Sequence, residues 1–429
     1  MKLRNLIMLT VRSMARIRWK LFLICSVCIC SFFLIDQMAS NSFRFIYHKI
    51  ELSRMLKYGK ENTLQIKFNY IEETDGFINS VNQLMQYIDK VDGIYAGGSY
   101  DESSEYFGEL KNNPKYQNIN RKAYANTFRM ETLGLSEVIY VNHGMEQLCK
   151  LKTIVGDTDF KKYKEENIRP VLVGYGLRDI LKAGTIITSQ SNGQKYQVVG
   201  ILEKDQKWFG DVDAVGTGVV SLNYKIIAAR SQNEIDKSDN RVMSTLCTLS
   251  TSFLLLESNS ETENIKNLII TKAKQLGLSV SIVPMEEVIK DYEESYRENM
   301  NTAFLITFVF VLFSSIAISS SAVVSILMRK REIGILYANG CSRRDIAWKI
   351  ILENAYIIFL SVGIAFSIRT YLILKDKFKA FSGLIRQIHI QLTLPFMVLI
   401  TLLIIIIASV PPVMIMSKMK PVELIGGNE

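Results

Sequence analysis

Residue types that carry chemistry are sparse in this sequence, and their spacing builds no catalytic or metal site. The three histidines, His48, His143 and His389, have no cysteine or carboxylate at the spacing of metal ligands, so we expect them at surface or stalk positions. The chain has no G-x-S-x-G nucleophile turn and no G-x-x-x-x-G-K-S/T phosphate loop, and Gly97-Gly98 is expected to form a turn. We therefore expect no catalytic residue, no metal ligand and no nucleotide or other cofactor held by this chain.

The six cysteines divide by location rather than by motif. Three of them lie in the first apolar stretch, where small polarisable side chains favour close helix packing over a redox or metal site: Cys25, Cys28 and Cys30. Cys341 falls on the side predicted below to be cytoplasmic, where thiols stay reduced. Cys149 and Cys247 lie in the large polar region predicted to be outside, and are candidates for a disulfide.

Residues 329–349 are the richest stretch in local structural signals. Asn339-Gly340 supplies a residue suited to the left-handed conformation that ends a helix. Ser342, followed three residues later by Asp345, is close to the capping box that begins one. We expect the preceding helix to continue to Ala338, and the stretch to form a helix–turn–helix elbow. The alternative is a basic topology loop with ordinary caps.

The arginines of this elbow suggest a docking role. Arg343 and Arg344 can pair with acidic groups of a protein partner, or with lipid phosphate. Gly334 and Gly340 allow close approach or tight turning. Glu353, just beyond the elbow, is costly in lipid and is expected to face another helix or the headgroups.

Four stretches have the length and apolar character of membrane spans, since a helix needs about 20 apolar residues to cross a bilayer core. They are 19–38, 302–328, 350–372 and 392–416. The first also resembles a signal peptide, but no A-x-A cleavage site follows it, so we favour a retained helix. The fold class expected is an α-helical membrane protein with four transmembrane helices, one before and three after a large α+β extracytoplasmic domain.

The basic residues give the orientation. The formal charge is +9, and Lys and Arg concentrate before the first span, between the second and third, and after the fourth. Both termini, the 329–349 loop and the tail at 417–429 are therefore expected in the cytoplasm, with a short outer loop at 373–391. Residues 1–18 fit an amphipathic helix on anionic lipid, or simply a basic topology signal. Nucleic-acid binding is excluded by this distribution, because no basic–aromatic module is present.

The outer region, 39–301, begins and ends with similar patterns. Alternating apolar residues, then helical spacing, then a further apolar run occur at both 60–97 and 251–284. These two strand–helix–strand units could pair into one split βαβ subdomain, or remain unrelated. Between them, 98–250 predicts a strand-rich insertion, and 285–301 a charged helical stalk that leads into the second span.

The run R-K-R-E-I-G-I-L-Y-A-N-G-C-S-R-R-D-I at 329–346 resembles the signature of FtsX-like permeases, the MacB-type membrane subunits of ABC transporters. Lys420-Pro-Val-Glu423 resembles the closing motif of that family, and the topology is similar as well. Tyr337 and Asn339 depart from the pattern, and the insertion at 100–165 has no counterpart in it. The elbow residues that the resemblance assigns to coupling with an ATPase are Arg331, Glu332, Gly334, Gly340, Ser342, Arg343, Arg344 and Asp345.

The resemblance implies a subunit that is not itself an enzyme. A separate cytoplasmic ABC ATPase dimer would bind ATP and Mg²⁺, and a second permease chain would complete a homodimer or heterodimer. The complex would export or extract a peptide, lipid-like or drug substrate, of the antimicrobial-peptide or macrolide type. The alternatives are a non-transporting mechanotransmission complex that activates a cell-wall hydrolase, and a membrane receptor without an ATPase. We expect a multi-pass protein of the plasma membrane, in contact with its lipid.

Overall fold

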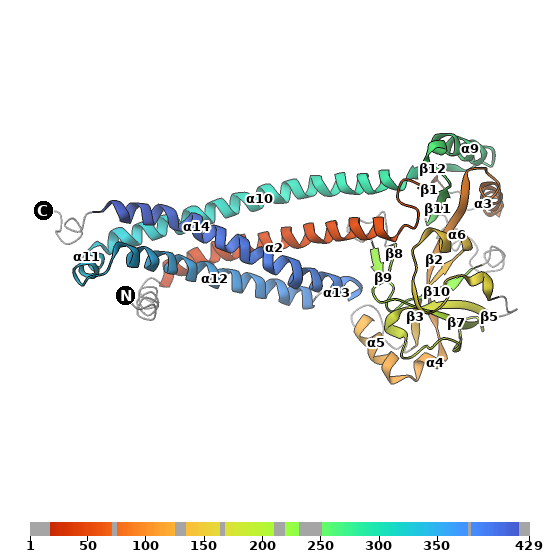
Figure 1. Cartoon of the computed structure of the whole chain (residues 1–429), viewed down its shortest axis with the longest axis horizontal. Coiled ribbons are helices and arrows are strands. Elements are labelled where there is room, and N and C mark those ends of the chain that lie inside the picture. The colour runs from red at the N-terminus through yellow and green to blue at the C-terminus, as the bar shows by residue number, and fades with distance from the viewer. Residues whose placement is uncertain are drawn as a thin grey trace. The chain divides into compact units, whose positions relative to one another are not determined.

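The computed structural model describes several ranges of the chain (Figure 1), namely 18–70, 75–124, 134–163, 168–209, 219–230, 251–375 and 379–419. The amphipathic helix expected at 1–18, apart from its last residue, and most of the tail at 417–429 lie outside the described residues. The chain divides into two compact units. The helical unit comprises Met1–Phe45, Arg297–Asp376 and Phe381–Glu429, and the sheet unit comprises Ile46–Tyr296 and Lys377–Ala380.

Long apolar helices build the helical unit, because a helix satisfies its own backbone hydrogen bonds in an apolar medium. Four described stretches are long and apolar enough to cross a membrane: Phe22–Met55, Met285–Met328, Arg343–Lys375 and Leu384–Lys418. The elements are α2 (Arg18–Met55), α10 (Met285–Met328), α11 (Lys330–Ala338), α12 (Arg343–Lys375), α13 (Lys379–Ile388), a π-helical turn (His389–Thr393) and α14 (Leu394–Lys418). Buried side chains of α2, α12 and α14 form the packed centre, among them Cys28, Phe32, Ile358 and Met397.

Two helical stretches differ from the sequence-based expectation. The helix expected to run on to Ala338 is interrupted, since α10 ends at Met328 and α11 begins only at Lys330. The outer loop expected at 373–391 is helical over 379–391, as α13 and the π-helical turn. Leu384 and Ile388 lie one helical turn apart, which favours a helix here, and from Leu384 onward this helix belongs to the fourth candidate span.

The sheet unit contains one ten-stranded sheet, and its first half interleaves two distant parts of the chain. In the order β12-β1-β11-β2 all neighbours are antiparallel. The strands are β12 (Ser279–Pro284), β1 (Thr63–Tyr70), β11 (Ser252–Leu256) and β2 (Ile94–Tyr106). Helices α3 (Asp75–Ile88) and α9 (Thr262–Gln275) pack a shared hydrophobic core against this half (Figure 1). The two strand–helix–strand units therefore lie in a single sheet.

The second half of the sheet is mixed and follows in the order β3-β10-β5-β7-β4, with β6 on β7. The β3–β10 and β5–β7 pairs are parallel and the others antiparallel. These strands are β3 (Leu135–Val141), β10 (Ile226–Ala229), β5 (Ile168–Val173), β7 (Lys195–Leu202), β4 (Thr153–Gly156) and β6 (Ile186–Thr188). A separate ribbon pairs β8 (Lys207–Phe209) with β9 (Val219–Ser221), and the short helices are α4 (Gly108–Lys111), α5 (Pro114–Tyr124) and α6 (His143–Leu148).

Strand β2 joins the two halves of the sheet. Its first part, Ile94–Ser99, pairs with β11, and its second part, Tyr100–Tyr106, pairs with β3. The backbone thus runs through the boundary expected at residues 97–98 without leaving the sheet. The turn expected at Gly97-Gly98 is wrong: both glycines lie inside β2. A side chain at Gly98 would approach the backbone of Met145 on α6, with its Cβ 3.0 Å from the nitrogen, so glycine is needed for close helix–strand contact.

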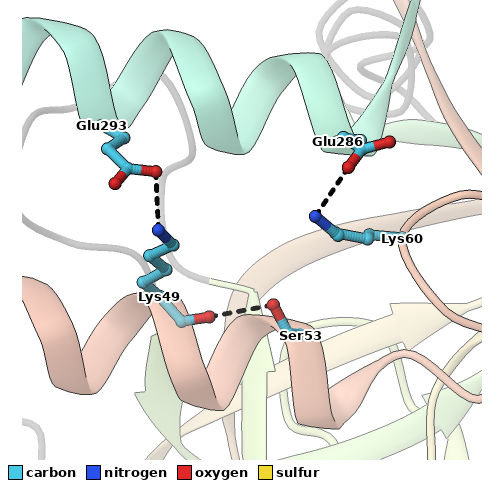
Figure 2. Close-up of polar contacts among 5 residues, drawn as sticks. All are labelled: Lys49, Ser53, Lys60, Glu286 and Glu293. Atoms are coloured by element: carbon cyan, nitrogen blue, oxygen red, sulfur yellow. Dashed lines mark hydrogen bonds and ion pairs between the residues drawn. The ribbon is translucent and has the colours of Figure 1, made fainter.

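The end of α2 and the beginning of α10 are held together within the sheet unit by apolar burial and by ion pairs. Met285, the first residue of α10, is fully buried in a cluster that includes Leu52 and Met55 of α2 and Trp208 of β8. Around this cluster Lys49 Nζ lies 2.6 Å from Glu293 Oε2, and Lys60 Nζ lies 2.8 Å from Glu286 Oε1 (Figure 2). The Lys49 and Glu293 side chains are 39% and 46% exposed, so water screens their attraction.

Apolar burial should therefore dominate this anchor. We expect Met285→Ala to lower the free energy of unfolding by about 2–4 kcal/mol, because it leaves a cavity in a packed core. Lys49→Ala should lower it by less than about 1 kcal/mol. Urea unfolding of the detergent-solubilised chain, followed by tryptophan fluorescence with Trp19 and Trp348 replaced by Phe so that only Trp208 reports, measures both. Met328→Ala, at an 82% exposed methionine of the helical unit, is the matched control. A loss for Lys49→Ala as large as that for Met285→Ala would contradict this ranking.

Candidate functional site

The elbow at 329–349 begins with a break in the helix at Arg329. This residue has φ −113° and ψ 22°, outside the helical region, and it precedes the first turn of α11. Its guanidinium bridges two helices: Nε lies 3.0 Å from Glu332 Oε2 on α11, and Nη1 lies 3.3 Å from Glu353 Oε1 on α12. Lys349, which is 7% exposed, lies 4.0 Å from the same oxygen of Glu353. Glu353 thus faces cationic side chains at the elbow.

The turn between α11 and α12 is made by Gly340. It has φ +81°, and the two backbone bonds of a Schellman motif surround it: Cys341 N donates to Leu336 O at 3.0 Å, and Gly340 N donates to Tyr337 O at 2.9 Å. These bonds satisfy carbonyl groups at the end of α11 that would otherwise lack partners.

A reciprocal cap starts α12 immediately afterwards. Asp345 N donates to Ser342 Oγ at 3.2 Å, and Ser342 N donates to Asp345 Oδ2 at 3.0 Å. This is the capping-box arrangement, with the shorter Asp in place of Glu or Gln. The turn signals in the sequence therefore correspond to the bonds that define the elbow.

One face of the elbow packs on α14. The buried side chains come from α10, both arms of the elbow and α14: Ile326, Ile333, Ile346, Ile350 and Met416. Gly334 is also buried, and the Tyr337 hydroxyl lies 3.4 Å from Met416 Sδ. Tyr337, a departure from the family pattern, thus joins α11 to α14. This shared core fixes the two arms relative to each other, so a force on either arm acts on the whole elbow.

The opposite face of the elbow is exposed and basic. Arg331, Arg343 and Arg344 are exposed, as are Glu332 and Ser342, whereas Asp345 is half-buried. Two apolar side chains that the sequence analysis missed lie one helical turn from arginines. Ile335 follows Arg331 on α11 and is 53% exposed, and Trp348 follows Arg344 on α12 and is 59% exposed. Their i, i+4 spacing from the arginines was the available signal. The coupling role of this face stays a prediction.

Other residues singled out in the sequence lie elsewhere. Cys149 is buried in the sheet unit, while Cys247 lies outside the described residues, so their disulfide stays a prediction. The histidines were expected at surface or stalk positions; His48 lies in α2 and His389 in the π-helical turn, and each is 1% exposed, so neither is at the surface. Val219 N donates to His48 Nδ1 at 3.2 Å in the sheet unit, and an imidazole with such a partner tolerates burial. His389 lies in the helical unit.

Comparison with known proteins agrees with the motif at the elbow. A family model described as FtsX-like permease C-terminal matches residues 304–421. No curated protein matches the sequence. Among solved structures, the chain is similar to the extracellular domain of the noncanonic ABC-type transporter YknZ from Gram-positive bacteria, at 14% identity and a TM-score of 0.32, over 52% of this chain and 100% of that one. It is also similar to the periplasmic region of MacB from Actinobacillus actinomycetemcomitans, at 12% identity and a TM-score of 0.32, over 54% and 92% of the two chains.

The matched segment contains the apolar part of α10, the complete elbow, α12, α13 and α14. It therefore includes every residue of the helix–turn–helix that the sequence singled out. The resemblance of 329–346 to the FtsX-like family is confirmed, because residues 304–421 match the family model of the FtsX-like permease C-terminal region.

Proposed function

We propose that this chain is the membrane permease subunit of an ABC transporter, and that its elbow receives the movement of a separate cytoplasmic ATPase dimer. The observation that carries the proposal is the two-sided elbow inside the matched segment. One face is fixed to α14 by buried Ile333, Ile346 and Met416, and the other exposes Arg343, Arg344 and Trp348. An exposed aromatic beside arginines is the residue combination that most often dominates protein interfaces.

In this proposal the four apolar helices cross the plasma membrane, with both termini and the elbow in the cytoplasm and the sheet unit outside. Helices α2 and α10 each continue from the helical unit into the sheet unit as a single helix. A helix transmits force along its axis because its backbone bonds are internal. The buried anchor around Met285 would receive that force in the sheet unit. A second permease chain, identical or related, completes the complex.

The substrate we propose is a peptide, lipid-like or drug molecule that is exported or extracted. An apolar or amphipathic substrate of this kind partitions to the membrane, where the outer unit of a permease could engage it. The ATP and Mg²⁺ required would be held by the partner ATPase, and this chain would supply only the docking face and the lever.

The docking face has a direct test. Arg343→Glu combined with Arg344→Glu should reduce recovery of a co-purifying ATPase about tenfold or more, because reversing charges at an interface makes close approach repulsive. The measurement is ATP hydrolysis in the eluate after affinity purification of the detergent-solubilised full chain. Arg297→Glu, at an exposed arginine of α10, is the matched control. Equal ATPase recovery from all three chains would show that the arginines do not dock the partner.

The turn at Gly340 should matter for coupling rather than for docking. Gly340→Val forces a β-branched residue to φ +81°, which costs about 1–3 kcal/mol and distorts the elbow. We expect ATP hydrolysis to persist while substrate transport falls severalfold. Gly340→Asn should retain transport, because asparagine tolerates this conformation.

A matched control exists in the sheet unit. Gly277 has φ +75° and, like Gly340, no atom within 4 Å of the Cβ that a substitution would add. Gly277→Val therefore introduces the same strain far along the chain from the elbow. If Gly340→Val transports as well as Gly277→Val, the elbow is not the coupling element.

A further inference from the structure

Two buried ionisable side chains and a third that is partly exposed meet in the helical unit, each from a different element. Asp36 of α2 is 0% exposed, and His389, the first residue of the π-helical turn, is 1% exposed. Arg369 of α12 completes the group. Arg369 Nε lies 3.9 Å and His389 Nδ1 lies 3.4 Å from one carboxylate oxygen, Asp36 Oδ1. No part of the proposed coupling function uses these residues.

Several buried polar atoms of this group make no hydrogen bond. Among the described residues, both Asp36 oxygens, Arg369 Nε and His389 Nδ1 have no hydrogen-bond partner, although they lie at ion-pair distance from one another. Ionisable groups at this depth in an apolar helical unit are expensive, and in a membrane they usually mark a functional site. Buried polar atoms without hydrogen bonds require an explanation. We find that explanation in which ring nitrogens of His389 carry a hydrogen.

The contacts of Thr370 favour a proton on Nε2 of His389. Its hydroxyl donates to Phe366 O, one turn back on α12, at 2.8 Å. The single hydroxyl proton is then used, so Thr370 Oγ1, which lies 3.1 Å from His389 Nε2, accepts a hydrogen bond from that nitrogen. The Phe366 ring stacks on the imidazole, with centroids 4.3 Å apart and planes 10° apart, and holds it in this orientation.

A neutral ring protonated at Nε2 would present the lone pair of Nδ1 to the Asp36 carboxylate at 3.4 Å. Two acceptors would then face each other in a buried site. A proton between them removes this conflict. Arg369 Nε lies at ion-pair distance from the same carboxylate oxygen, a geometry in which Asp36 is the anion, so we place the proton on the ring.

We propose that Asp36, His389 and Arg369 form a proton-binding site in which His389 is an imidazolium ion paired with the Asp36 carboxylate. The bound proton is the ligand, and it joins α2 to the π-helical turn that leads into α14. Among the described residues, the charged or titratable groups that pair here are Asp36 on α2, Arg369 on α12 and His389 itself. The π-helical turn fits this role, because single π-helical turns inside longer helices often occur at functional sites.

The test is the protonation state of His389 in the full chain. The chain, labelled with ¹⁵N-histidine, is placed in lipid nanodiscs at neutral pH, and the ring nitrogens are observed by NMR. His389→Gln identifies the signals of this residue among the three histidines. We expect both nitrogens of His389 to give the signals of protonated nitrogens in the wild-type chain. A neutral ring, with the proton on either nitrogen alone, overturns the proposal.

Asp36→Asn tests whether the Asp36 carboxylate is the group that pairs with the protonated His389 ring. The asparagine amide can donate to Nδ1, so the conflict disappears without an added proton and His389 should become neutral, protonated at Nε2. Glu353→Gln, at a carboxylate of the same unit that pairs with Arg329, is the matched control and should leave the His389 signals unchanged. A cationic ring that persists in Asp36→Asn would remove Asp36 from the site. The wild-type spectrum decides the proposal even if this variant does not fold.

Discussion

Burial of apolar side chains from both arms of the elbow against α14 is the contact on which the proposed coupling depends. Ile333 of α11 and Ile346 of α12 share one core with Met416, so the turn at Gly340 joins two arms that are already fixed. The Schellman bonds and the Ser342–Asp345 cap then satisfy the backbone at that turn. Without the apolar core, these local bonds would define a turn but not a rigid lever.

The ion pairs of the molecule are of two kinds, those exposed to water and those largely removed from it. At the anchor of α2 and α10 in the sheet unit, the exposed pairs of Lys49 and Lys60 add little beyond the burial of Met285. In the helical unit, the Asp36 group and the Arg329–Glu353 pair are largely removed from water. There an unpaired charge would cost several kcal/mol, so the partners are obligatory rather than optional.

Local signals predicted local structure well. Alternation of Leu64, Ile66 and Phe68 indicated a strand, and β1 covers Thr63–Tyr70. The capping signals at 339–345 correspond to observed bonds, because such bonds join residues only a few positions apart. Predictions failed where distant residues decide the environment. Gly98 was expected in a turn, yet it pairs with Phe253 inside β2, and it must be glycine because α6 packs on it. The sequence contains no signal for either contact.

By itself the sequence determined the apolar helices, the strand–helix–strand periodicities, the caps of the elbow and the family motif, since each depends on residue type and spacing along one element. Only the tertiary structure decided how β1 and β2 interleave with β11 and β12, and that β2 carries the sheet onward into the insertion. It also decided that Asp36, Arg369 and His389 meet. These residues are far apart in the chain, and their proximity follows from helix packing that no short pattern encodes.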